Sequence, residues 1–257
     1  MPLIEYHYRS DALNRDTTVD VLLPEKLPAD DCPVVTLLHG MHGSYDSWLR
    51  KTCIERFAAK RGIAVIMPDG ANSFYQDMKY GEKYFTLIAT EIPERMRNTF
   101  GFSAKREKNF IAGLSMGGYG AFHTALCLPG QYAGAASLSG SLDLRLRNGN
   151  PEKWPLCKAI WGEDFLQTVP GSDADLMHLI ETFPDASPAP KLFFACGTED
   201  PLYPMHRNMI EALQKRGDRF NWTAEEGPGA HNWIFWNDWI GRALDAILPE
   251  ENLKTPV

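Results

Sequence analysis

NFIAGLSMGGYGAF, residues 109–122, joins a short apolar run to a helix-like stretch through the pattern Gly-X-Ser-X-Gly. The run Asn109–Ala112 has the composition of a buried strand, and Tyr119–Leu128 has the length and composition of a helix. The small residues on either side of Ser115 permit a sharp turn that holds the serine hydroxyl above the sheet. Backbone N–H groups at the start of the helix favour an oxyanion beside it. We therefore predict that Ser115 is a nucleophile.

The same alternation of apolar runs and longer amphipathic stretches extends over most of the chain. The strand-like runs are Val34–Leu38, Ile63–Met67, Asn109–Ala112, Ala135–Leu138 and Leu192–Cys196. The helix-like stretches are Ser47–Lys60, Tyr84–Phe100, Tyr119–Leu128, Met205–Arg216 and Ile234–Leu248. Short runs that are apolar on both faces are typical of a parallel sheet covered by helices. The pattern predicts an α/β fold with a mostly parallel central sheet, in a single domain over residues 1–257.

Two segments depart from this alternation. The opening 25 residues include Thr18-Val-Asp-Val-Leu-Leu, which predicts antiparallel strands at the edge of the sheet. The segment of about residues 142–190 is rich in Pro, Gly and Asn, with one local helix over Ala174–Thr182. It is too long for a simple connection. We expect it to form an excursion over the active site.

A serine nucleophile needs a base and an acid that orients the base. In a fold of this kind the chain order is serine, acid, histidine. His231 lies in a loop before the last helix-like stretch, where it can reach over the carboxyl edge of the sheet. Glu199 and Asp200 both follow a buried strand. We favour Asp200, because Pro201 fixes its turn and its side chain is shorter, and we keep Glu199 as the alternative.

An oxyanion also needs hydrogen-bond donors. One predicted donor is the backbone N–H of Met116, which directly follows the nucleophile. The second is the N–H of Met41, in the loop after the first central strand, where Gly40 allows a close approach of the backbone. His39 and His42 in this loop lack a third ligand nearby in the sequence, so we expect no metal. We expect no cofactor either.

Composition limits the classes of partner. The net charge is −7, which argues against a nucleic-acid or anionic-membrane surface. The five cysteines form no CxxC pair, and an odd, sparse set fits a reducing compartment. The N-terminus shows no apolar leader, and no apolar run is long enough to span a membrane. These features predict a soluble, cytoplasmic protein, with no nucleic-acid or membrane partner.

The motifs together resemble the esterase D-like branch of the α/β-hydrolases, and most of all the small bacterial tributyrin esterases. The resemblance covers most of the chain and is carried by LLHGMHGSYDSWLR, KREKNFIAGLSMGGYGAF, CGTEDPLY and GAHNWIFWNDWI. It implies the same roles for Ser115, His231 and Asp200 as nucleophile, base and acid, and for Met41 and Met116 as oxyanion donors. It also suggests Trp48 and Tyr75 as residues of the substrate pocket, with ordinary aromatic packing in the interior as the open alternative.

The resemblance implies a serine carboxylesterase that hydrolyses short-chain acyl esters. Related S-formylglutathione hydrolases carry a cysteine just after the oxyanion loop, where this chain has Met41-His42-Gly43-Ser44. A thioesterase of that type therefore carries less weight but stays open. Acetyl or feruloyl esterase activity on carbohydrate-derived esters, acyl transfer, and a non-catalytic binding role also stay open. So does a homo-oligomer, because related enzymes commonly self-associate.

Overall fold

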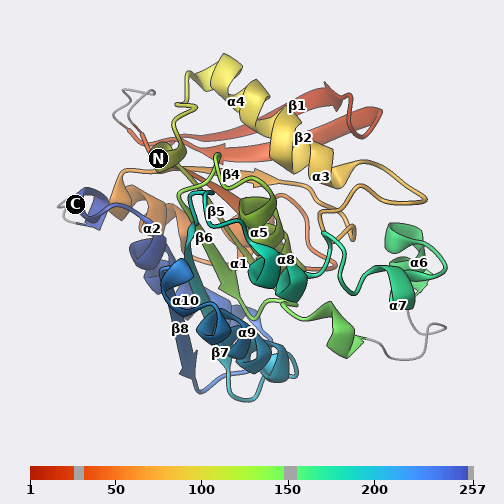
Figure 1. The fold of residues 1–257 in the computed structure, drawn as a ribbon. Coiled ribbons are helices and arrows are strands. Elements are labelled where there is room, and N and C mark those ends of the chain that lie inside the picture. The colour runs from red at the N-terminus through yellow and green to blue at the C-terminus, as the bar shows by residue number, and fades with distance from the viewer. Residues whose placement is uncertain (26–31, 148–154, 254–257) are drawn as a thin grey trace.

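The computed structural model describes residues 1–25, 32–147 and 155–253. Its centre is a sheet of eight strands in the order β1-β2-β4-β3-β5-β6-β7-β8 (Figure 1). Strands β3 to β8 pair in parallel, while β1 and β2 pair antiparallel at one edge. The strand bounds are β1 Leu3–Ser10, β2 Arg15–Leu22, β3 Val34–Leu38, β4 Ala64–Pro68, β5 Asn109–Leu114, β6 Gly134–Leu138, β7 Lys191–Gly197 and β8 Trp222–Gly227. The predicted parallel sheet and its antiparallel edge are confirmed.

The central strands are apolar on both faces because each face packs on its own hydrophobic core. In β7, Phe193 and Ala195 belong to one core, and Leu192 and Phe194 belong to the other. This alternation follows from the two-residue period of a strand. A sheet buried on both sides requires helices on both sides, which is the reason for the α/β architecture.

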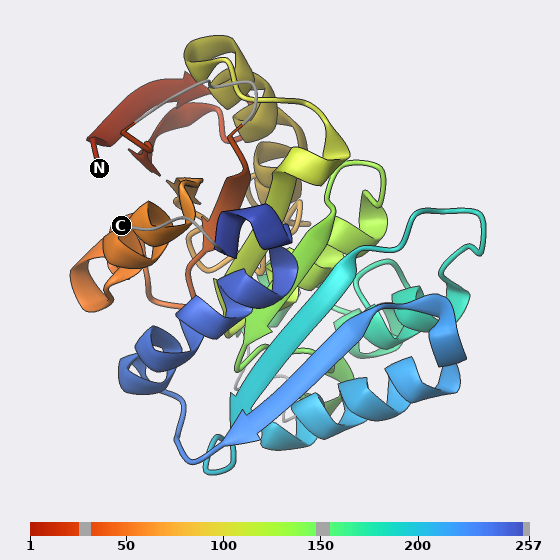
Figure 2. The ribbon, with the colours of Figure 1, turned by 90° about the vertical axis from the view of Figure 1, so that its left-hand side faces the viewer.

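Helices cover both faces of the sheet, as the turned view shows (Figure 2). Helices α1, α2 and α10 pack on one face, and α4, α5, α8 and α9 pack on the other. The helix bounds are α1 Ser47–Lys51, α2 Ile54–Arg61, α3 Tyr84–Thr86, α4 Ile92–Phe100, α5 Met116–Cys127, α6 Pro155–Trp161, α7 Phe165–Thr168, α8 Leu176–Thr182, α9 Tyr203–Lys215 and α10 Trp233–Ile247. In the described residues, no helix is both long and apolar enough to cross a membrane.

Two predicted helices differ from a continuous α-helix. The stretch Ser47–Lys60 forms α1 and α2, separated by Thr52 and Cys53, and the backbone of Thr52 is extended (φ −141°, ψ 174°). The Thr52 hydroxyl donates to the carbonyl of Trp48 and accepts from the N–H of Ile54, so it closes one helix and supports the start of the next. The stretch Tyr84–Phe100 is helical throughout, but Leu87–Glu91 has π-helical hydrogen bonding.

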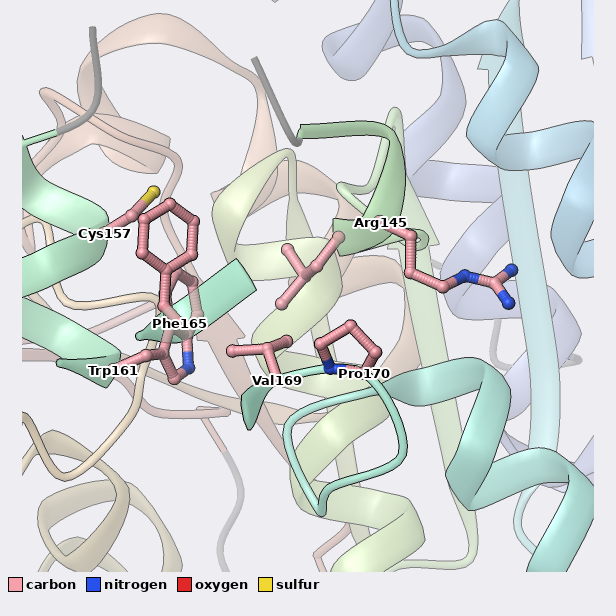
Figure 3. A pocket seen from close by; sticks show the side chains of 7 residues that line it. Arg145, Cys157, Trp161, Phe165, Val169 and Pro170 are labelled. Carbon is pink, nitrogen blue, oxygen red and sulfur yellow. The ribbon is translucent and has the colours of Figure 1, made fainter. Parts of the chain in front are cut away.

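The predicted excursion contains α6, α7 and α8, of which only the last was anticipated. Residues 148–154 of this segment lie outside the described residues. Side chains of α6 and α7 enclose a cavity of about 10 Å³ together with Leu144, Val169 and Pro170, and the Arg145 guanidinium points away from it (Figure 3). The backbone N–H groups of Lys79 and Tyr80 donate to carbonyls of α6 and fasten the excursion to the loop after β4.

Candidate active site

Ser115 lies at the sharp turn between β5 and α5, in a backbone conformation that residues other than glycine rarely adopt (φ 53°, ψ −116°). Its N–H donates to the carbonyl of Leu138, and its own carbonyl accepts from Tyr119 and Ser141, so the turn is held on both sides. The flanking glycines leave no room for a side chain. A Cβ on Gly113 would lie 2.3 Å from the carbonyl oxygen of Gly117. The Gly-X-Ser-X-Gly pattern is therefore required by close backbone contacts.

His231 and Asp200 meet at this serine from two different loops. His231 follows β8 and precedes α10, which begins with Asn232 accepting from two helix N–H groups. The His231 Nε2 lies 3.0 Å from Ser115 Oγ, and its Nδ1 lies 2.8 Å from Asp200 Oδ2. The Trp236 ring lies nearly perpendicular to the imidazole, with the two ring centroids 5.0 Å apart. The three side chains form a continuous hydrogen-bonded chain.

Asp200 is buried, whereas Glu199 is exposed to solvent. Burial by itself raises the pKa of Asp200, but hydrogen bonds from His231 and the Leu202 N–H outweigh it and hold that pKa below its ordinary value. The carboxylate therefore stays ionised at neutral pH. An ionised, buried acid at Nδ1 fixes the tautomer of His231 that leaves Nε2 free to accept a proton. The geometry selects Asp200 over Glu199 as the partner of His231.

The two predicted oxyanion donors both have unoccupied N–H groups. In the described residues, neither Met116 N–H nor Met41 N–H has a hydrogen-bond acceptor. Met116 is the first residue of α5, where helix N–H groups lack intrahelical partners. Met41 lies in the loop after β3, and its peptide shares its plane with the carbonyl of Gly40.

His39 orients that peptide, a role that the sequence did not reveal. Its Nδ1 lies 2.8 Å from the carbonyl oxygen of Gly40, and its Nε2 accepts from the N–H of Gly70 at 2.9 Å. Accepting at Nε2 requires the proton on Nδ1, so the buried ring is neutral and donates to Gly40. In a trans peptide the Met41 N–H then points the opposite way from that carbonyl. Both ring nitrogens are occupied, which leaves none for a metal.

Trp48 and Tyr75 pack in the interior, which was the open alternative to a place in the substrate pocket. Both are fully buried, so neither side chain can touch a substrate. The Trp48 Nε1–H donates to the carbonyl of Leu38 at 3.1 Å, and the Tyr75 hydroxyl donates to the carbonyl of His39 at 2.8 Å. Their polar atoms thus satisfy the two carbonyls that precede the oxyanion loop. Both residues therefore lie near the site, but they support the backbone behind the oxyanion loop.

An open cleft of about 500 Å³ lies directly at Ser115. Its walls are residues 40–43, Leu114, Ser115, His231, Lys51, Trp233 and Trp236. None of the described residues of the excursion lines it. The cleft is therefore built from the oxyanion loop on one side and from the start of α10 on the other.

Comparisons with known proteins find relatives that match over nearly the whole chain. A family model described as "Putative esterase" matches residues 10–247. An acetyl esterase of Caldicellulosiruptor saccharolyticus is 32% identical over 263 residues, covering 95% of this chain and 97% of the relative. The substrate-bound structure of the fluorophosphonate-binding serine hydrolase F of Staphylococcus aureus matches with a TM-score of 0.88 at 31% identity, over 96% of this chain and 98% of the other. An S-formylglutathione hydrolase structure from the same organism matches with a TM-score of 0.84 at 30% identity, over 96% and 99%.

Proposed function

Because the chain belongs to the esterase family of the α/β-hydrolases and is a serine carboxylic-ester hydrolase, we propose that Ser115, His231 and Asp200 are its catalytic triad. The observation that carries this proposal is the unbroken chain of hydrogen bonds from Ser115 Oγ through His231 to Asp200. The substrates are esters with short acyl groups. Support for the short acyl group comes from the acetyl esterase that is 32% identical over nearly the whole chain.

In the first half of the reaction, Ser115 Oγ attacks the ester carbonyl while His231 Nε2 takes the hydroxyl proton. The carbonyl oxygen becomes an oxyanion, which accepts hydrogen bonds from the N–H groups of Met41 and Met116. His231 then gives its proton to the leaving alcohol as the C–O bond breaks. The acyl group remains on Ser115 as an ester.

In the second half, a water molecule attacks the acyl-enzyme and His231 takes its proton. The same two N–H groups stabilise the second oxyanion, and the proton returns to Ser115 Oγ as the carboxylic acid leaves. Asp200 keeps its negative charge throughout and stabilises the imidazolium that forms twice in each cycle. The pKa of Asp200, held low by its hydrogen bonds, suits this constant charge.

The test uses p-nitrophenyl esters from acetate to decanoate with the native enzyme and Ser115→Ala. We expect the highest kcat/KM on acetate to butyrate, and a loss in kcat on the order of 10⁴ to 10⁶ in the variant. A fluorophosphonate probe should label the native enzyme but not Ser115→Ala. The control is Ser44→Ala, which removes a different hydroxyl, at the end of the oxyanion loop, and should still be labelled. Full turnover by Ser115→Ala would overturn the proposed triad.

A thioester is the second candidate substrate, because the staphylococcal S-formylglutathione hydrolase matches this chain over almost its full length. The same triad would release a thiol in place of an alcohol. Comparison of kcat/KM for S-formylglutathione and for a butyrate ester of similar reactivity separates the two. A preference of more than about tenfold for the thioester, which is roughly 1.4 kcal/mol in the barrier, would move the assignment to a thioesterase.

Three further expectations complete the proposal. Residues 1–257 form a single domain, the protein is cytoplasmic, and copies of the chain associate into a homo-oligomer. Light scattering of the purified protein tests the last of these directly.

A further inference from the structure

Lys51 is the one fixed charge among the ten described residues that line the cleft at Ser115. No aspartate or glutamate is among them. The chain as a whole has a net charge of −7, so a cationic cleft does not follow from average composition. A lone ammonium group at the rim of an otherwise uncharged cleft attracts anions.

The Lys51 ammonium is positioned by an aromatic ring and not by a carboxylate. Its Nζ lies 4.9 Å from the centroid of the Trp233 ring, within the range of a cation–π contact. The preceding Arg50 is paired with Asp46 at 3.0 Å, whereas Lys51 has no carboxylate within 4.0 Å in the part of the chain that the structure describes. Its charge is therefore available to a ligand.

Lys51 lies on the side of the cleft that receives the leaving group. His231 must protonate the leaving oxygen from Nε2, so the leaving group departs on the His231 side of the serine. Trp233 and Trp236 follow His231 along the chain and stand on that side, with Trp236 against the imidazole and Trp233 under Lys51. A leaving group on this path meets two indole rings and one ammonium group.

We propose that this face selects esters whose leaving group carries a negative charge, and that Lys51 is the residue that recognises the charge. The proposal rests on the proposed function, because it names the substrate class of the same site. The proposal makes no change to the preference for short acyl groups, since it assigns Lys51 to the leaving group alone. Trp233 supplies the flat apolar surface beside the charge.

The test compares two acetate esters that differ in charge and little in shape, 4-acetoxybenzoate and 4-acetoxybenzamide. The measured quantity is the ratio of their kcat/KM values, so the difference in their intrinsic reactivity cancels between enzyme variants. In Lys51→Gln we expect this ratio to fall roughly fivefold, because kcat/KM for the anionic benzoate falls more than kcat/KM for the neutral amide. In Lys51→Glu the ratio should fall further, and in Lys51→Arg it should be retained. Added salt should lower the ratio in the native enzyme.

Lys105→Gln is the matched control. Lys105 is exposed and lies before the start of β5, whereas Ser115 follows the end of that strand. Each variant removes one positive charge, so the two proteins have the same net charge. Its ratio should equal that of the native enzyme. An unchanged ratio in both Lys51→Gln and Lys51→Glu, with normal hydrolysis of the amide, would overturn the role of Lys51 while leaving the esterase assignment intact. Failure of the native enzyme to hydrolyse either ester would instead contradict the proposed function.

Discussion

The Tyr75 hydroxyl donates a 2.8 Å hydrogen bond to the carbonyl oxygen of His39, beneath the loop that carries the proposed donor Met41. Burial raises the pKa of Tyr75 well above its ordinary value, so the phenol stays protonated and donates. The bond fixes the peptide between His39 and Gly40, and the His39 ring fixes the next one. Two successive peptides are thus locked before the chain reaches Met41.

We expect Tyr75→Phe to leave the ring in place and free the His39 carbonyl. An unpartnered buried carbonyl costs about 1–3 kcal/mol of stability. Because the loop loses one of its restraints, kcat should also fall several-fold, while KM stays nearly constant, since Tyr75 does not reach the cleft. The measurements are urea unfolding and steady-state kinetics on p-nitrophenyl acetate.

Tyr119→Phe is the control for this prediction. Tyr119 is equally buried, and its hydroxyl donates a 2.7 Å bond to the carbonyl of Ala174, which belongs to the excursion. It should lose similar stability without losing kcat. Equal losses of kcat in the two variants would mean that Tyr75 acts only through general stability.

Gly117→Ala tests the packing of the turn at the nucleophile. A Cβ on Gly117 would lie 2.4 Å from the carbonyl oxygen of Leu38 and 2.6 Å from that of His39. These are backbone atoms of β3 and the oxyanion loop, so they cannot move aside without disturbing the sheet. We expect Gly117→Ala to lose about 3 kcal/mol or more in the free energy of unfolding. The folded fraction of this variant should also have lower esterase activity than the native enzyme.

Gly130→Ala provides the comparison, because a Cβ at Gly130 would meet nothing within 4 Å and its φ is negative. Its stability should change by less than about 0.5 kcal/mol. The readout is the urea midpoint of each variant. A Gly117→Ala protein as stable as Gly130→Ala would contradict the packing argument.

Local patterns predicted the strands and the order of Ser115, Asp200 and His231 because each depends on a short stretch of sequence. The apolar content of β3 and β5, and the small residues around Ser115, determine a strand and a turn wherever they occur. The split between α1 and α2 was not predictable, since it depends on the side-chain hydrogen bonds of Thr52.

Contacts between distant segments account for the remaining differences. His39 accepts a hydrogen bond from Gly70, which lies 31 residues further along the chain. Tyr75 donates one to His39 across 36 residues. Nothing in the local sequence says whether an aromatic residue near a site faces the substrate or supports the backbone behind it. The choice between Glu199 and Asp200 likewise needed the loop geometry that buries one and exposes the other.

Asp200→Asn should lower kcat by a factor of about 10⁴, because an amide donating to Nδ1 favours the tautomer with the proton on Nε2. KM should change little, since Asp200 does not line the cleft. Glu199→Gln is the neighbouring control, and its exposed side chain should leave kcat unchanged. The reverse result, with Glu199→Gln impaired and Asp200→Asn active, would transfer the acid role to Glu199.

Stability should decrease as the pH falls below about 6.5, because two buried histidines must be neutral in the folded protein. Desolvation lowers the pKa of His123 to about 4, and it does the same for His206. In the unfolded chain both rings have a pKa near 6.5, so the unfolded state binds more protons between pH 6.5 and 4. For His123 this difference is worth about 3 kcal/mol, fully present above pH 6.5 and lost progressively toward pH 4.

Asp20 acts in the opposite direction. Burial raises its pKa to about 6, so the folded protein gains stability as the pH falls through 6 toward the ordinary value of about 4. The two histidines outweigh it. Urea unfolding at pH 7.5 and 5.0 should show a lower free energy of unfolding at pH 5.0. The difference should shrink in His123→Asn, which cannot take up the proton, and grow in Asp20→Asn, which removes the opposing contribution. A His123→Asn protein with the native pH dependence would show that this ring does not titrate on unfolding.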